Sequence, residues 1–298
     1  MGTVRTIISV AASKDWSLFQ MDAISRAHTT IIYSLSIVVL LIYVDDILLT
    51  RSSHRLINDA KQYLYSQFKV KDLGELKYFQ WIDVLRSQHR ILMNQRKYAL
   101  EVILDVGLAG SKPVHTPLEP NIKLTSVEHD KCTGVQDDPL FKDMSRYQKP
   151  IGKLIYVTIT RPYICFVVQL LSLFMQHPKQ SHCMAALRVM RYVKGSPGLG
   201  IFLRKGPIDN LVVHCDSDWA ACPNTRRSVT CFVLQLGTSL ISWKSKKQQT
   251  VSCSSVEEEY RSMAAAVAEV IWMVGLLKDL CVEVSTLIQF YCDSKNPM

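Results

Sequence analysis

Several features that would place this chain in a secreted or disulfide-stapled class are missing from its sequence. The nine cysteines are an odd number, none of them forms a CxxC pair, and most lie in apolar runs such as Tyr163–Val168. Free cysteines in such runs behave as small hydrophobic residues rather than as parts of a disulfide framework. We therefore expect reduced thiols and an intracellular compartment, without a distinction between a cytoplasmic particle and the nucleus.

Export signals and long hydrophobic runs are also missing. The first 30 residues do not have the charged and then apolar pattern of a signal sequence. The longest apolar run, Ile31–Val44, covers 14 positions and is interrupted by Tyr33, Ser34 and Ser36, whereas a membrane-spanning helix needs about 20 apolar residues. We expect a chain that neither crosses nor binds a membrane.

The composition is that of a globular protein with an excess of positive charge. The chain has 298 residues, of which 48% are hydrophobic and 20% charged, so it can bury a substantial core in about two domains. Its net charge of +9 favours a polyanionic partner such as nucleic acid. The Lys and Arg residues are dispersed, and a basic charge by itself is weak support for that partner.

The most informative stretch is 36–50, SIVVLLIYVDDILLT, in which an apolar run ends in two adjacent aspartates. The branched residues of 38–42 predict a strand buried on both faces, and Asp45 and Asp46 then fall where a hairpin would turn. Paired carboxylates at a rigid tip suit Mg²⁺, which takes oxygen ligands. The alternative is that Asp-Asp is ordinary turn chemistry after a core strand.

The sequence Tyr43-Val44-Asp45-Asp46 with this flank resembles the palm-domain signature of copia-type retrotransposon reverse transcriptases. A short predicted strand, Trp16–Asp22, ends in an acid and resembles the family segment that carries the first catalytic aspartate. The resemblance implies that Asp22, Asp45 and Asp46 bind two catalytic Mg²⁺ or Mn²⁺ ions and act on a template-primer.

The distance between these acids is short for the family. Only 23 positions separate Asp22 from Asp45, and residues 23–36 match nothing expected at this point. The resemblance therefore implies that the segment forming the nucleotide pocket is deleted. We expect polymerisation to be lost.

The middle of the chain continues the resemblance. A helix is predicted over residues 53–68, and a hairpin with strands 81–86 and 90–94 looks like the primer-contacting region, where Lys77 is a candidate nucleic-acid contact. Gln80-Trp81 replaces the usual Leu-Gly, and we expect Trp81 to clash or to change the bend. Residues 119–147 have little periodicity and are predicted to be loop or linker.

Two helical regions follow this linker. Helical periodicity resumes over residues 147–174, and 182–194 is a second amphipathic helix. Both resemble the thumb and connection helices of the family. Arg188 and Lys194 on the second helix are candidate phosphate contacts, although a solvated basic face is the commoner explanation.

A second set of acids lies in the last hundred residues. Asp216 follows a predicted strand, a long helix that starts at Ser254 or Ser255 carries Glu259 along its apolar edge, and a last strand ends at Asp293. Acids in this strand, helix, strand order can converge on two metal ions that activate water against a phosphodiester. Asp218 and Glu257 are the alternatives within their motifs; Glu257 is expected to pair with Arg261 and Glu258 to cap the helix.

The segments CDSDWA, SWKSKKQ, SSVEEEY and YCDSKNP resemble the ribonuclease H domain of the same polyproteins across nearly all of 211–297. The resemblance implies Asp216, Glu259 and Asp293 as metal-binding catalytic acids and an RNA:DNA hybrid as the substrate. The candidate hybrid contacts are Trp243, Lys244, Lys246 and Lys247, with an exposed basic hairpin as the alternative. The family continues beyond the point equivalent to Met298 with another catalytic acid, so we expect an incomplete domain.

Together these features predict an α/β (α+β) chain in three parts. Residues 1–118 form a partial reverse-transcriptase palm and thumb, 119–197 a linker with connection helices, and 198–298 a ribonuclease H-like mixed sheet with helices. The ancestral activity is RNA-directed DNA synthesis with metal-dependent cleavage of the RNA strand of a hybrid, and we expect this activity to be reduced or lost, with at most weak cleavage from the three remaining acids. The alternatives are a nucleic-acid-binding remnant without catalysis and a pseudogene product without a stable fold.

Overall fold

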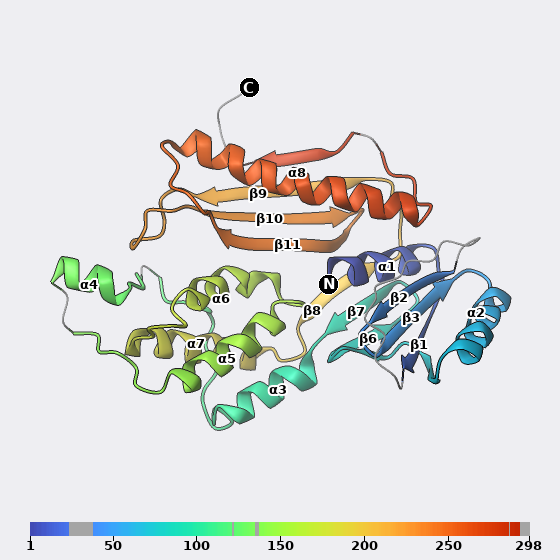
Figure 1. The fold of residues 1–298 in the computed structure, drawn as a ribbon, viewed down its shortest axis with the longest axis horizontal. Helices are drawn as coiled ribbons and strands as arrows, with labels where there is room; N and C mark the ends of the chain where they lie inside the picture. Colours follow the sequence, from blue (N-terminus) through green and yellow to red (C-terminus); the bar gives the residue numbers. More distant parts are fainter. Residues whose placement is uncertain (24–37, 121, 135–136, 286, 293–298) are drawn as a thin grey trace.

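The computed structural model describes residues 1–23, 38–120, 122–134, 137–285 and 287–292. These form a mixed α/β fold with three four-stranded sheets and a group of helices (Figure 1). The sheet formed by the C-terminal strands β9 to β12 lies along one side of the molecule. The other two sheets and the helical group lie along the opposite side. The expected α/β (α+β) class is confirmed.

The first sheet carries the Asp-Asp hairpin and has the strand order β2-β3-β1-β4. Its strands are β1 (Ser17–Ala23), β2 (Val39–Tyr43), β3 (Asp46–Arg51) and β4 (Val70–Glu75). Branched residues fill β2 and β3, and Leu41, Leu48 and Leu49 are almost fully buried, as expected for a strand pair covered on both faces. Helix α2 (His54–Gln67) packs on β3. The predicted strand, hairpin and helix are confirmed.

The second sheet joins parts of the chain that we had predicted to be separate. It consists of β5 (Tyr78–Phe79), β6 (Ile82–Arg86), β7 (Arg90–Asn94) and β8 (Gly200–Arg204). Strand β8 lies beyond the predicted boundary at residue 197, yet it pairs antiparallel with β7. Gly200 permits this contact, because a Cβ atom there would lie 2.1 Å from the carbonyl oxygen of Met93.

The helical group forms a second core around Tyr147, Leu154 and Val189. Its helices are α3 (Arg96–Asp105), α5 (Met144–Val157), α6 (Cys165–Ser172) and α7 (Gln180–Gly195), with a short 3-10 turn η1 (Pro162–Ile164). The apolar region 147–174 is therefore divided into α5, η1 and α6. Pro162 explains the division, because it has no amide proton for a continuous helix and disfavours helical backbone in the residue before it.

The region 119–147, which we expected to be loop or linker, contains a helix and a buried ion cluster. Helix α4 (Val127–Thr133) begins after Ser126, whose hydroxyl accepts a hydrogen bond from the His129 amide, and ends at Gly134 in the left-handed conformation. The Lys179 ammonium, 3% exposed, pairs with Asp130 and Asp138. These ion pairs hold the region against the start of α7. The partners are more than 40 residues apart in the chain, so no local sequence pattern indicates them.

The third sheet has the order β11-β10-β9-β12 and carries the second set of acids. Its strands are β9 (Leu211–Asp218), β10 (Val229–Leu236), β11 (Ser239–Lys247) and β12 (Gln289–Cys292). Strand β12 is parallel to β9, and the other pairs are antiparallel.

In the part of the chain that the structure describes, only α8 (Ser255–Asp279) is long and apolar enough to span a membrane, and it packs on β9 and β10.

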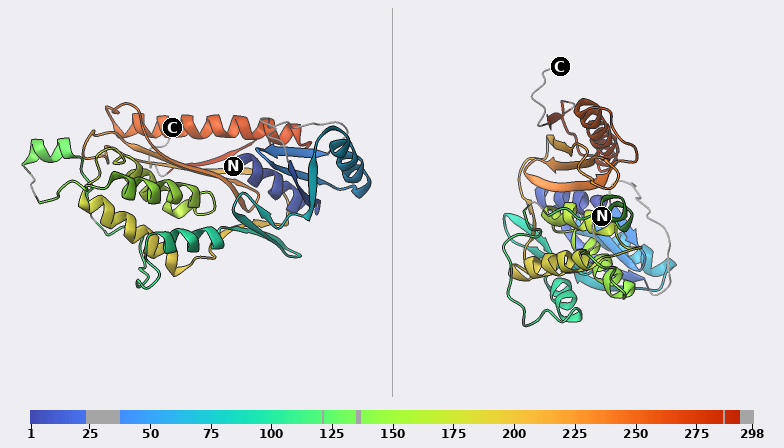
Figure 2. Two further views of the ribbon diagram at one scale, coloured as in Figure 1. Left: turned by 60° about the horizontal axis from the view of Figure 1, so that its bottom comes forward. Right: turned by 90° about the vertical axis from the view of Figure 1, so that its left-hand side faces the viewer.

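Helix α1 (Gly2–Ser13) lies beneath the third sheet, and every residue from Val4 to Ala12 is buried (Figures 1 and 2). The buried Arg5 guanidinium stacks 3.8 Å from the centre of the Trp243 ring. It also donates to the carbonyl oxygens of Ile241 (2.7 Å) and Ile159 (2.8 Å). One hydrophobic cluster includes residues of α1, β3 and β9, so the strands that carry the two predicted sets of acids share a core.

Candidate active sites

The three acids predicted for the palm, Asp22, Asp45 and Asp46, lie at one end of the first sheet. Asp22 and Asp46 are directly opposite each other in the antiparallel pairing of β1 and β3, so their side chains lie on the same face. Asp45 is exposed in the turn, next to Val44, whose φ of 55° is in the left-handed region. A branched residue rarely adopts this conformation, which costs about 1–3 kcal/mol and is concentrated at functional sites.

The Asp46 carboxylate already has two hydrogen-bond donors within the chain. The Gln20 side-chain amide donates to Oδ1 at 2.8 Å, and the Gln80 amide donates to Oδ2. The Tyr156 hydroxyl of α5 donates to the backbone carbonyl of Gln80, which links this network to the helical group. Each Asp46 oxygen therefore has a carboxamide partner that a metal ion would have to displace or share.

Trp81, the residue next to Gln80, does not produce the clash that we expected of a bulky side chain at a position where the family usually has glycine. Trp81 has a φ of 59°, in the left-handed region that favours glycine, but its ring is 47% exposed and does not crowd the turn. The ring packs against Tyr78 and Tyr98 with centroid distances of 6.3 and 6.1 Å. The expected clash is absent at Trp81 because the side chain projects onto the surface.

The second site combines Asp216 of β9 with Glu259 of α8. Asp216 is exposed near the end of its strand, and Glu259 is half-buried in the second turn of the helix. The Ser262 hydroxyl donates to the Asp216 carbonyl oxygen at 3.0 Å and so fixes α8 against β9. Burial and the Cys292 thiol, with smaller effects of the Asp216 and Glu259 carboxylates, raise the pKa of Cys215 to about 12.

Asp293, the third acid predicted for this site, lies outside the described residues. Cys292, the residue before it, is paired in register with Cys215 of β9, the residue before Asp216. Across residues 1–23, 38–120, 122–134, 137–285 and 287–292, no group of three or more His, Cys, Asp or Glu side chains could hold a metal ion. The three-acid metal site therefore stays a prediction.

The alternative acids have different environments. Burial and the neighbouring Asp216 charge raise the pKa of Asp218. Glu257 forms the predicted ion pair with Arg261 (2.6 Å). It also accepts a hydrogen bond from the Cys253 amide, and this bond with the Arg261 contact holds the pKa of its carboxyl below the usual value.

The expected capping role of Glu258 is wrong. The Ser254 hydroxyl accepts from the Glu257 amide, and the Glu257 carboxylate accepts from the amide of Cys253, the residue before the N-cap, so the reciprocal bond of a capping box is displaced by one residue. Glu258 is instead 2% exposed. The packing of α8 on β9 and β10 buries Glu258 and leaves Glu257 partly exposed beside Ser254, because each step of one residue rotates a helix by about 100°.

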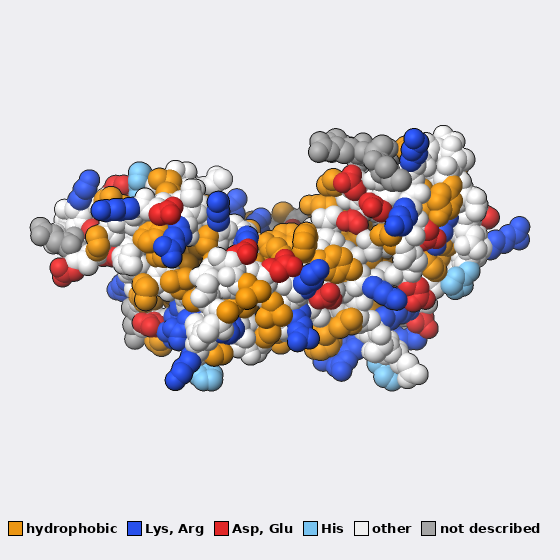
Figure 3. Space-filling model, turned by 90° about the horizontal axis from the view of Figure 1, so that it is seen from below, with side chains coloured by type: hydrophobic (Ala, Val, Ile, Leu, Met, Phe, Trp, Pro, Cys, Tyr) orange, Lys and Arg blue, Asp and Glu red, His pale blue; other side chains and the backbone are white. Residues whose placement is uncertain are grey.

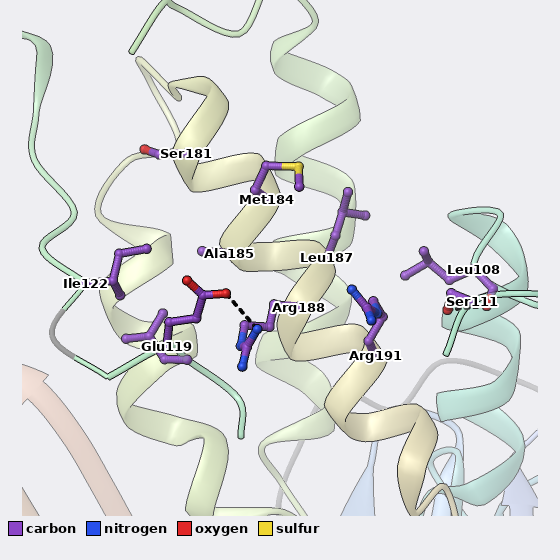
Figure 4. Close-up of a pocket in the computed structure, with 11 residues that line it drawn as sticks. Leu108, Ser111, Glu119, Ile122, Ser181, Met184, Ala185, Leu187, Arg188 and Arg191 are labelled. Atoms are coloured by element: carbon purple, nitrogen blue, oxygen red, sulfur yellow. Dashed lines mark hydrogen bonds and ion pairs between the residues drawn. The ribbon is translucent and has the colours of Figure 1, made fainter. Parts of the chain in front are cut away.

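Several candidate nucleic-acid contacts are engaged within the chain. The Trp243 indole donates to the Thr158 carbonyl oxygen at 3.1 Å beneath Arg5. The Lys194 ammonium donates to three backbone carbonyl oxygens, of Leu108, Ala109 and Ser111, which uses all its protons. Arg188 pairs with Glu119 at 2.8 Å beside a mostly apolar pocket of about 490 Å³ (Figure 4). These contacts explain the side chains without nucleic acid.

The remaining basic candidates are more accessible. Lys77, Lys244 and Lys246 are exposed, and Lys247 is half-buried with its ammonium 3.8 Å from the Cys222 sulfur. On the face shown in Figure 3, Lys and Arg are interspersed with acidic and hydrophobic side chains rather than gathered in one patch. The dispersed charge predicted from the sequence is visible there, and a nucleic-acid role for these lysines stays a prediction.

Comparison with known proteins supports the class that the first sheet and its acids suggest. Residues 30–120 match a family model described as reverse transcriptase (RNA-dependent DNA polymerase). The chain is 38% identical over 259 residues, 87% of its length, to the Pol polyprotein of transposon RE1 from Arabidopsis thaliana. It is 30% identical over 263 residues to that of transposon TNT 1-94 from Nicotiana tabacum.

A shorter relative, an uncharacterized mitochondrial protein of Arabidopsis thaliana, is 41% identical over 233 residues, which cover 78% of this chain and 93% of that protein. The matched regions are 17% and 19% of the lengths of the RE1 and TNT 1-94 polyproteins. The chain belongs to the copia-type retrotransposon Pol polyprotein family, with a reverse transcriptase domain.

Proposed function

We propose that this chain cleaves the RNA strand of RNA:DNA hybrids by a metal-dependent ribonuclease H reaction and does not polymerise DNA. The observation that carries the first part is the hydrogen bond from the Ser262 hydroxyl, one helical turn after Glu259 on α8, to the Asp216 carbonyl oxygen of β9, which brings the two acids to neighbouring positions. Asp293 follows β12, the parallel neighbour of β9, and would add a third carboxylate. Carboxylate oxygens are the ligands that Mg²⁺ and Mn²⁺ take.

In this proposal, Asp216, Glu259 and Asp293 hold the ions and the chain orients the hybrid. The bound ions would supply an activated water and charge stabilisation at the leaving oxygen. The exposure of Asp216 leaves its carboxylate open to ions and phosphate, and the half-buried Glu259 is held in place by α8. The exposed Lys244 and Lys246 on β11 would contact the phosphate backbone of the hybrid.

The direct test is cleavage of a labelled RNA:DNA hybrid by the purified chain with Mg²⁺ or Mn²⁺. We expect Asp216→Asn, Glu259→Gln and Asp293→Asn each to reduce the rate by at least about 100-fold, because each removes a charged metal ligand. Asp209→Asn and Glu283→Gln make the same chemical changes at exposed positions and should keep the rate of the unmodified chain. Equal rates in all five variants would show that the cleavage comes from elsewhere.

The loss of polymerisation has its own support and its own test. The interval between Asp22 and Asp45 is short for the family, and both oxygens of Asp46 are hydrogen-bonded by carboxamides. We expect no dNTP incorporation on a primed RNA or DNA template, with an active reverse transcriptase as the positive control. Extension that disappears in Asp45→Asn would refute this part of the proposal.

The second candidate is a nucleic-acid-binding protein without catalysis, which the net charge of +9 favours. It predicts hybrid binding that weakens steeply with salt and is unchanged by Asp216→Asn, with no cleavage. A near-UV circular dichroism signal would first establish that the chain is folded. A folded chain that binds but does not cleave would select this candidate.

A further inference from the structure

Two thiols that the proposed reaction does not use face each other across the third sheet. The sulfur atoms of Cys215 and Cys292 are 2.7 Å apart, and the two residues are direct partners in the parallel pairing of β9 and β12. Cys215 is 5% exposed and Cys292 is half-buried. Both cysteines are free thiols in this structure.

The backbone geometry of this pair suits a covalent bond. Neighbouring strands lie about 4.8 Å apart, which is within the range of about 4.4–6.8 Å between the Cα atoms of natural disulfides. The sulfur atoms already point at each other, so bond formation needs a small rotation of the side chains and no movement of either strand. We propose that Cys215 and Cys292 form a reversible disulfide that clasps β12 to β9.

The clasp would act where the sheet is least supported. Strand β12 has four residues, lies at the edge of the sheet and pairs only with β9 among the described strands. Edge strands with a single short ladder open more easily than central strands. The bond would hold together the two strands that come directly before Asp216 and Asp293, whether or not these acids cleave nucleic acid.

The reaction needs a thiol oxidant, and a low-molecular-weight disulfide such as oxidised glutathione is sufficient. The half-buried Cys292 would exchange first, giving a mixed disulfide and one reduced glutathione. Cys215 would then lose its proton and attack the Cys292 sulfur, which forms the internal bond and releases a second reduced glutathione. Two thiols are oxidised and one glutathione disulfide is reduced, so electrons and protons balance.

Burial has a further consequence for the rate of closure. Cys215 is 5% exposed, so an external disulfide reaches it slowly and closure proceeds through the more accessible Cys292. The chain would remain a dithiol under reducing conditions and close only under sustained oxidation. This behaviour is typical of the transient disulfides of intracellular proteins.

The test is disulfide mapping of the full chain after equilibration in oxidised glutathione, with alkylation of the remaining thiols. We expect a peptide pair that joins Cys215 to Cys292, assigned by fragmentation and lost after reduction with dithiothreitol. The closed ring is long, so we expect the thermal midpoint to rise by about 5 °C on oxidation. Cys292→Ser should abolish both effects, and Cys253→Ser, an exposed cysteine, should abolish neither.

The mapping requires no variant, so it remains decisive if a substitution at Cys215 prevents folding. Alkylation of both thiols after prolonged oxidation, with exposed Cys253 or Cys281 oxidised instead, would overturn the proposal. A cross-link without a rise in the thermal midpoint would overturn the clasp. Neither result depends on hybrid cleavage, so failure here is distinct from failure of the proposed function.

Discussion

Substitution of Lys179 by Met is expected to lower the free energy of unfolding by about 3–5 kcal/mol, because it leaves the buried Asp130 and half-buried Asp138 carboxylates without their counter-charge. The Lys179 ammonium contacts Asp130, Asp138 and the Thr125 hydroxyl. Burial works against ionisation of Asp130, but its hydrogen bonds with Lys179 and Thr125 hold the pKa of that carboxyl below its usual value. Both acids are therefore charged in the folded chain at neutral pH.

The measurement is urea unfolding followed by circular dichroism at neutral pH. Lys142→Met is the matched control, since Lys142 is exposed in the same region and its loss should cost less than about 0.5 kcal/mol. Adding Asp130→Asn and Asp138→Asn to Lys179→Met should recover about 1 kcal/mol or more, because the unpaired charges are then removed. A cost below about 1 kcal/mol for Lys179→Met alone would show that water reaches the cluster.

Acidification from pH 6.5 to pH 4 is expected to destabilise the chain through His182, which lies beside this cluster. The ring is fully buried and stacks on Phe174 at a centroid distance of 3.9 Å. Its Nδ1 accepts a hydrogen bond from the Lys179 amide at 3.0 Å, so the neutral ring carries its proton on Nε2 and donates to the Thr125 carbonyl oxygen at 3.1 Å. Burial and the Lys179 charge lower the pKa of His182 to about 4.

The sign follows from the number of bound protons. Between pH 6.5 and about 4 the unfolded chain protonates this histidine and the folded chain does not, so stability falls as the pH falls. The loss over the whole window is about 3 kcal/mol, from about 1.4 kcal/mol per unit of pKa shift. Asp130 and Asp138, whose pKa values are lowered, lose their contributions only at more acidic pH.

Urea unfolding between pH 4 and pH 7 would measure this dependence. His182→Asn keeps a hydrogen-bond acceptor for the Lys179 amide but cannot titrate, so its stability should change less over this window. His89→Asn, at an exposed position, should retain the full slope of the unmodified chain. The same slope in all three proteins would assign the acid sensitivity to other groups.

Much of the local structure was predictable from the residues alone. Branched residues followed by Asp45 and Asp46 indicated a strand and a turn, and β2 and β3 are present as expected. The apolar periodicity of α2, α7 and α8 and the serines at the start of α8 likewise indicated those helices. Such signals survive in the sequence because they depend on neighbours within one or two turns.

The environments of the candidate side chains were less predictable. Trp243 and Lys194 are residue types that often contact nucleic acid. Their polar hydrogens are instead directed to backbone carbonyl oxygens of residues distant in the chain. Conversely, nothing in the sequence near Gln80 indicates its hydrogen bond to Asp46, 34 residues away. A side chain with several polar hydrogens has no local preference among such partners.

The residues alone indicated the family, the Asp-Asp hairpin and the helices α2, α7 and α8. Tertiary packing added contacts that no local pattern indicated: β8 pairs with β7 of the second sheet, α1 is buried beneath the third sheet, and Lys179 pairs with two aspartates. It also decided that Cys215 and Cys292 meet, 77 residues apart. The reason is physical: secondary structure follows from local periodicity, whereas these contacts depend on which surfaces remain to be buried once the elements have formed.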